Sequence, residues 1–189
     1  MILRTVRKLS LVESAEKRRD LEFWLGRAPD ERLAAVDRLR NEWHGDGARQ
    51  LLALFNAHQV EYVVVGGYAL AFHGAPRFTG DLDLLVRATD GNAAKIVAAL
   101  VAFGFGSLGL TAGDFLAPDR VVQLGVPPAR IDLLTSISGV TWEDVSSGRV
   151  RGAYGEVPVD FIGRREFVKN KRASGRHRDL ADLEALGEA

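Results

Sequence analysis

The segment from Tyr62 to Asp83 constrains the fold and the chemistry of this chain more than any other. It reads YVVVGGYALAFHGAPRFTGDLD, which is an apolar strand, a glycine pair, a short helix, a basic turn and two carboxylates one residue apart. Glycines at a strand-to-helix turn let the backbone approach a phosphate group closely, and a helix begins with free N–H groups. This order predicts a site that holds a nucleoside triphosphate on backbone amides and binds its phosphates through a divalent metal ion.

Length and composition limit the class of protein. At 189 residues the chain is large enough for one well-buried core with a small appendage. Basic and acidic residues number 25 each, so any attraction to nucleic acid must be local. The chain has no cysteine, which excludes disulfide bonds, thiol nucleophiles and thiolate metal sites. We find no signal-peptide pattern, and four glycines break the longest uncharged run, Ile96 to Gly113, so we expect a cytoplasmic protein that does not enter a membrane.

From Asp46 onward, helical and strand patterns alternate, which predicts an α/β (α+β) fold with a mixed sheet flanked by helices. The order of the strands cannot be deduced from these patterns. We expect helices near 48–58, 67–73, 92–103, 164–172 and 179–186, and strands at 61–65, 82–86, 121–124, 130–134, 149–154 and 157–161.

Residues 1–45 differ from the rest because they are dense in charge and patterned as two helices. Pro29 suits the first position of the second helix, and Gly45 suits its C-cap. We therefore divide the chain into an N-terminal helical hairpin, 1–45, and a main domain, 46–189. The hairpin either packs on its own domain or acts as an arm that binds a partner or a second copy.

Three carboxylates form the second part of the predicted site. Asp81 and Asp83 flank Leu82, so in a strand both point to the same face. Two like charges this close are costly unless a cation lies between them, and Mg²⁺ prefers oxygen ligands. Asp132 lies in the apolar segment RIDLL, where a buried carboxylate needs a partner. Together they predict a shared metal site, whereas the first two alone would be a solvated strand end.

Other polar residues have two interpretations each. Arg77 and Thr79 offer a guanidinium and a hydroxyl suited to phosphate oxygens, but a surface ion pair or a turn would also explain them. The pair Gly66 and Gly67 could simply form a tight turn. The basic stretch 164–178 is either a solvated face or a contact surface for the triphosphate or an RNA.

The segment GGYALAFHGAPRFTGDLD, followed by Asp132, resembles the nucleotidyltransferase fold of the DNA polymerase beta superfamily. It is most similar to small bacterial abortive-infection and toxin–antitoxin nucleotidyltransferases (AbiEii-type). The segment KNKRASGRHRDLADLEAL is similar to one in that group where a lysine precedes an R-x-x-D-x-x-D-like helix. The resemblance covers roughly residues 50–186. Many members of the group have Gly-Ser where this chain has Gly-Gly, so a serine hydroxyl is missing there.

The resemblance also implies residue roles. Lys171 would contact phosphate, with Lys169 as a competing candidate, and Asp179 and Asp182 would belong to the closing helix. The group that would bind nucleotide is Gly66, Gly67, Arg77, Thr79 and Lys171, and the group that would ligate Mg²⁺ or Mn²⁺ is Asp81, Asp83 and Asp132.

The implied reaction is transfer of a nucleoside monophosphate from a triphosphate such as ATP to an acceptor hydroxyl, with release of pyrophosphate. The acceptor would be tRNA, another RNA or a protein, and the enzyme could be the toxin of a toxin–antitoxin or abortive-infection pair. Asp81 and Asp83 would hold the metal on the triphosphate, and Asp132 would help ligate a second metal that lowers the pKa of the attacking hydroxyl. The alternative is a non-catalytic antitoxin or partner-binding module with the same fold.

Overall fold

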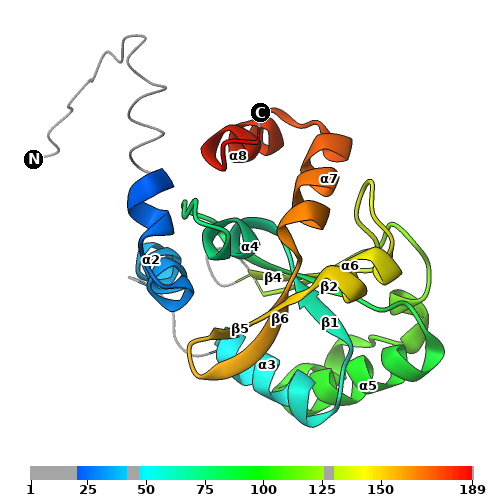
Figure 1. Ribbon diagram of the computed structural model, residues 1–189. Coiled ribbons are helices and arrows are strands. Elements are labelled where there is room, and N and C mark those ends of the chain that lie inside the picture. The colour runs from blue at the N-terminus through cyan, green and yellow to red at the C-terminus, as the bar shows by residue number, and fades with distance from the viewer. Residues whose placement is uncertain (1–20, 42–46, 126–129, 189) are drawn as a thin grey trace, which may run out of the picture.

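Six strands form one mixed sheet that runs through the middle of the molecule (Figure 1). The computed structural model of the protein describes residues 21–41, 47–125 and 130–188. The strands follow the order β3-β4-β2-β1-β6-β5 across the sheet. Their bounds are Tyr62–Val64 (β1), Asp81–Val86 (β2), Val121–Leu124 (β3), Arg130–Leu134 (β4), Val150–Tyr154 (β5) and Val157–Phe161 (β6).

The centre of the sheet is buried on both faces. Strand β2 pairs in parallel with β4, and β1 in parallel with β6, whereas β1–β2, β3–β4 and β5–β6 are antiparallel. Every residue of β1 is buried, and so is the second half of β2. Continuous apolar runs are typical of strands covered on both faces. The first half of β2 differs, because Asp81 and Asp83 alternate there with buried Leu82.

Helices cover both faces of this sheet. In Figure 1, α3 and α5 lie together on one side, whereas α4 and α7 lie on the other. The short segments after α5 are one turn of π-helix and two of 3₁₀-helix. The bounds are Pro29–Asn41 (α2), Gly47–Ala57 (α3), Gly66–Phe72 (α4), Asp90–Leu100 (α5), Val101–Phe105 (η1), Gly106–Leu108 (η2), Ala112–Phe115 (η3), Trp142–Gly148 (α6), Arg164–Ser174 (α7) and His177–Ala185 (α8).

The mixed α/β class that the sequence predicts is confirmed, and each predicted strand and helix from residue 47 onward is present within a few residues of its expected bounds. The sequence analysis missed helix α6. A capping box begins this helix, in which Thr141 and Asp144 each bond the other's backbone N–H. Its helical pattern is only seven residues long, and Val145 is its one buried residue.

Among the residues that the structure describes, one segment, Asp90–Leu108, has the length and apolar composition that a membrane-crossing helix needs. Its first part is α5, which buries Ala93, Ile96 and Ala99 in the hydrophobic core. Its second part is not continuous α-helix, because Gly104 interrupts η1 with a φ of 107°. The first part therefore belongs to the core, whereas most residues of the second part are exposed.

Helix α2 is part of the same core as the sheet. Within the predicted hairpin, the structure describes residues 21–41, with a helical stretch at 21–25 and then α2. Residues 1–20 and 42–45 of the hairpin, including the predicted C-cap Gly45, lie outside the described residues. Leu33 and Val36 of α2 are buried in the core. The carboxylate of Asp37 accepts hydrogen bonds from the hydroxyl groups of Tyr68 at 3.0 Å and Tyr154 at 2.9 Å. One acidic side chain thus connects α2 to α4 and to the edge strand β5.

Replacing Asp37 should loosen this connection. We expect Asp37→Ala to lower the free energy of unfolding by about 2 kcal/mol, because it removes a charged acceptor shared by two buried hydroxyl groups. Urea denaturation measures the change. The control is Asp30→Ala on the same helix, which is exposed and should cost less than about 1 kcal/mol through the helix dipole. Equal losses in the two variants would contradict this role of Asp37.

Candidate metal and nucleotide site

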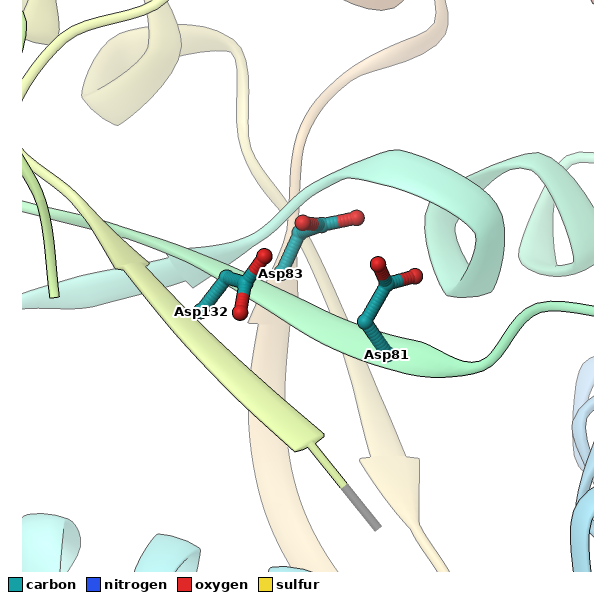
Figure 2. Close-up of side chains that lie close together, drawn as sticks. All are labelled: Asp81, Asp83 and Asp132. Carbon is teal, nitrogen blue, oxygen red and sulfur yellow. The ribbon is translucent and has the colours of Figure 1, made fainter. Parts of the chain in front are cut away.

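Strands β2 and β4 place four charged residues in a two-by-two arrangement. In the parallel register, Asp83 lies beside Asp132, and Asp81 lies beside Arg130. Residues two apart in a strand point to the same face, so all four side chains share one face of the sheet. Figure 2 shows the three carboxyl groups gathered on the same side of the two strands.

Asp81, Asp83 and Asp132, here called the aspartate triad, lie close enough to share a cation. One carboxylate oxygen from each lies within 4.8 Å of those of the other two. Asp132 is only 6% exposed, and the other two are partly buried. Three carboxylates are a hard oxygen donor set that suits Mg²⁺ or Mn²⁺. The triad residues therefore fit the metal that the sequence predicts.

The glycine pair fits tightly against this cluster. Gly66 has a φ of 63°, and a Cβ added there would lie 1.9 Å from an oxygen of Asp83. A Cβ on Gly67 would lie 2.8 Å from the side chain of Thr79. Gly66 thus needs positive φ, as the tight-turn interpretation requires, and both glycines also make room for residues of the site.

Gly66→Ala should damage both the fold and the triad. We expect the free energy of unfolding to fall by about 2 kcal/mol or more, because an L-residue is strained at this φ and its Cβ would displace Asp83. Urea denaturation and electron paramagnetic resonance of added Mn²⁺ would show lower stability and weaker metal binding. The matched control is Gly80→Ala, where nothing lies within 4 Å of the added Cβ. A variant at Gly66 that behaves like the one at Gly80 would show that this close approach has no consequence.

The ionised form of Asp83 is disfavoured in the folded protein. Burial, together with the neighbouring charges of Asp81 and Asp132, raises the pKa of Asp83 to about 6, although Lys171 and Arg130 act in the opposite direction. In the part of the chain that the structure describes, no hydrogen bond to its carboxylate is found. A cation placed between the carboxylates would relieve this repulsion.

The raised pKa predicts how stability depends on pH. The folded protein binds a proton at Asp83 more tightly than the unfolded chain does, so this stabilising contribution is full below pH 3.8 and is lost as the pH rises through about 6. In a chelator, the free energy of unfolding of the wild type should fall relative to that of Asp83→Asn by about 1–3 kcal/mol between about pH 4 and about pH 7. Urea denaturation across this range measures it. If the free energies of unfolding of the two proteins changed in parallel with pH, the raised pKa of Asp83 would be contradicted.

Donors surround the other two members of the triad. The hydroxyl of Thr79 donates to Asp81 at 2.7 Å, and the amide of Gln123 donates to Asp132 at 3.3 Å. The guanidinium of Arg130 forms ion pairs with both Asp81 and Asp132. Thr79 therefore orients a triad carboxylate here, in addition to lining the cavity.

Two residues of the site, Arg130 and Gln123, were not predicted from the sequence. Arg130 carried a usable signal, because it lies two residues before Asp132 and must share its face in a strand. Gln123 had none, since its place opposite Asp132 depends on the antiparallel register of β3 with β4.

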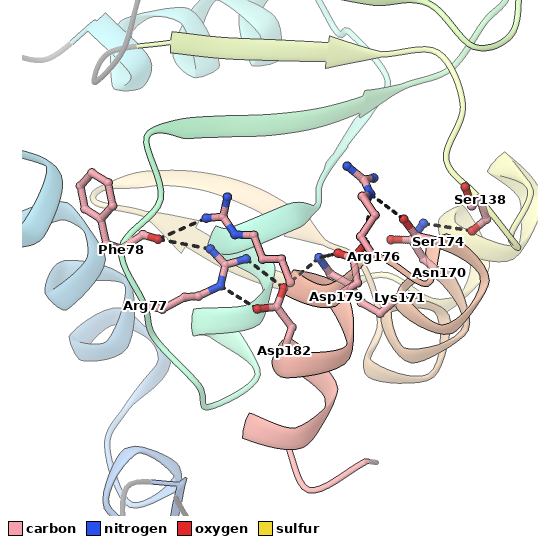
Figure 3. A network of polar contacts seen from close by, with 10 residues as sticks. Arg77, Phe78, Ser138, Asn170, Lys171, Ser174, Arg176, Asp179 and Asp182 are labelled. Carbon is pink, nitrogen blue, oxygen red and sulfur yellow. Dashed lines mark hydrogen bonds and ion pairs between the residues drawn. The ribbon is translucent and has the colours of Figure 1, made fainter. Parts of the chain in front are cut away.

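Lys171 lies inside a buried charge network that joins α7 to α8 (Figure 3). Its ammonium is 2.6 Å from Asp179 and 2.9 Å from Asp182. Arg77 forms a two-pronged ion pair with the same Asp182, at 2.6 and 2.9 Å. Burial by itself raises the pKa of Asp182, but the contacts with Arg77 and Lys171 outweigh it and hold that pKa below its ordinary value. Asp182 therefore stays ionised and joins the basic turn before β2 to the C-terminal helices.

A cavity of about 470 Å³ opens over the triad. Ligand pockets commonly have volumes of roughly 300–1,000 Å³, so a mononucleotide is within reach. All the predicted site residues line it, whereas the competing candidate Lys169 is exposed and is not among the lining residues. The cationic lining residues are Arg77, Arg130, Lys171, Arg176 and Arg178, and the uncharged polar ones include Thr79, Gln123, Ser136, Ser138 and Asn170.

Comparisons with known proteins add no relative. No protein-family model matches the chain, and no curated protein sequence matches it significantly.

Proposed function

We propose that this protein is a metal-dependent nucleotidyltransferase, which moves a nucleoside monophosphate from a nucleoside triphosphate to an acceptor hydroxyl. The observation that carries the proposal is the convergence of Asp81, Asp83 and Asp132 from two adjacent strands onto one point. The glycine turn at Gly66 presses directly against this point. Residues far apart in the sequence thus meet at one point, which supports the proposal.

The triad supplies the ligands in this proposal. Asp81 and Asp83 would hold the metal that binds the triphosphate, and Asp132 would help to ligate a second metal. Bound Mg²⁺ would neutralise charge on the phosphates and lower the pKa of the attacking hydroxyl. Because the pKa of Asp83 is about 6, this carboxylate is largely ionised and ready to bind metal above that pH.

Cations around the cavity account for triphosphate binding. Lys171 lines the same cavity as the triad, so its ammonium is available to phosphates bound there. Arg176 and Arg178 line the same cavity from the start of α8 and are exposed. Arg77 pairs with Asp182 of α8. Its role is therefore to hold α8 against the cavity as well as to attract phosphate.

The remaining expectations follow from the resemblance and the composition. The fold would be of the nucleotidyltransferase type, the donor ATP or another nucleoside triphosphate, and the acceptor a hydroxyl of tRNA, another RNA or a protein. We place the protein in the cytoplasm, as the toxin of a toxin–antitoxin or abortive-infection pair. A bound antitoxin would be its natural regulator.

The decisive experiment incubates the protein with each α-labelled nucleoside triphosphate, Mg²⁺ and total RNA or cell lysate, and resolves the products on a gel. We expect label transfer and pyrophosphate release from at least one nucleotide. Asp81→Asn and Asp132→Asn should each reduce both by about 100-fold or more, because loss of a metal ligand removes several kcal/mol of charge stabilisation.

The control for these variants is Asp160→Asn. Asp160 is also a strand carboxylate, but it pairs with Arg149 and Arg151 away from the aspartate triad. Transfer by this variant should match the wild type. Undiminished transfer by Asp132→Asn would refute the proposed site.

One observation favours a second candidate, a protein that binds nucleotide or a partner without catalysis, as an antitoxin would. Arg130 already neutralises two of the three carboxylates, so the cluster is tolerable without a metal. This candidate predicts nucleotide binding with neither transfer nor pyrophosphate release in the same assay. It also predicts that a stable partner covering the cavity co-purifies, and that its removal reveals no turnover.

A further inference from the structure

The guanidinium of Arg130 contacts two of the three carboxylates that a cation bound by the aspartate triad would contact. Its Nη2 contacts Asp81, and its Nε is 2.9 Å from Asp132. These two carboxylates belong to different strands, and the guanidinium spans them from the first residue of β4. A single positive group thus bridges two of the three metal ligands.

The donors around the triad show which contact would have to change. Asp81 receives one hydrogen bond from Thr79 and one from Arg130, on different oxygens. Asp132 contacts Gln123 through one oxygen and Arg130 through the other. The neutral donors occupy one oxygen of each carboxylate and can remain there when the other oxygen binds a metal. Of these donors, only the guanidinium of Arg130 carries a charge that competes with a cation.

Arg130 also has a second place to bind. Its side chain is 26% exposed and lines the cavity in which the phosphates would lie. A guanidinium presents its N–H groups as a rigid fork, and this fork matches phosphate oxygens as well as carboxylates. If the guanidinium of Arg130 moved from the carboxylates to a phosphate, it would therefore still have an anionic partner.

We propose that Arg130 is an exchangeable counter-ion of the triad, which rests on the proposed function. Without metal it neutralises Asp81 and Asp132. When a divalent cation binds, Arg130 leaves the carboxylates and pairs with the phosphates of the bound nucleotide. Metal and phosphate binding are then coupled through one side chain, since each stabilises the arrangement that the other needs.

Arg130→Gln separates this role from a structural one, because the two affinities should change in opposite directions. Titration of Mn²⁺ alone, followed by electron paramagnetic resonance, should show affinity about fivefold tighter than the wild type, equal to about 1 kcal/mol. Calorimetric titration of inorganic pyrophosphate at saturating Mn²⁺ should show affinity about fivefold weaker. A variant that only loosens the site would lose both affinities. Weaker or unchanged Mn²⁺ binding overturns the proposal.

Two further variants keep the test decisive. Arg176→Gln removes a positive charge from the same cavity, but from a residue that pairs with Asp179 rather than the triad. This variant should change the affinity for Mn²⁺ less than twofold. If it tightened Mn²⁺ binding as much as Arg130→Gln does, the effect would come from the overall charge of the cavity, and the proposal would be overturned. If Arg130→Gln does not fold, Arg130→Lys serves instead, because it keeps the charge but lacks the planar fork whose Nε and Nη2 contact the two carboxylates. That variant should bind Mn²⁺ about twofold more tightly, and no gain overturns the proposal.

The same titrations distinguish the failure of this proposal from the failure of the proposed function. If the wild type binds Mn²⁺, Asp83→Asn abolishes the binding and Arg130→Gln does not tighten it, only the counter-ion role is wrong. If neither the wild type nor Arg130→Gln binds Mn²⁺, the triad is not a metal site and both proposals fail.

Discussion

The lateral pairing of β2 with β4 is the interaction on which the candidate site depends. Because the two strands run in parallel and in this register, Asp83 lies beside Asp132, although 48 positions separate them in the chain. A shift by one residue would turn Asp132 to the opposite face of the sheet. Buried leucines on both strands, such as Leu84 and Leu133, fix the register by keeping their apolar faces in the core.

Charge balance is the second constraint, because five acidic side chains line one cavity and a sixth, Asp182, adjoins it. The lining acids are Asp81, Asp83, Asp119, Asp132 and Asp179. The three aspartates of the sheet are balanced by Arg130 and Lys171, whereas Asp179 and Asp182 are balanced by Lys171 and Arg77. Lys171 belongs to both groups. Removing one partner of a buried pair leaves an uncompensated charge, so these residues act as a unit rather than as separate contacts.

The sequence predicted the aspartates and the glycine turn because both depend on local geometry. Alternation in DLD and RIDLL shows which face a carboxylate takes, and Gly-Gly between a strand and a helix marks a turn. The strand order, the neighbour of Asp132 in β3 and the pairing of Arg77 with Asp182 depend on contacts between distant segments. A single sequence does not specify these contacts. Arg130 combines both kinds of dependence. The strand pattern predicts that its side chain shares a face of the sheet with Asp132, but its pairing with Asp81 depends on the register of β2 with β4.

The position of Arg130 has a consequence for how the protein is made. On the ribosome, Asp81 and Asp83 emerge early, and Lys171 and α8 emerge much later. If β2 and β4 pair in the nascent chain, three carboxylates come together before the ammonium of Lys171 has been synthesised. Arg130 is synthesised two residues before Asp132, so the neutralising group arrives with the third acid. The central strands can then associate before the C-terminal helices exist, and the nascent sheet avoids an unbalanced cluster of negative charge.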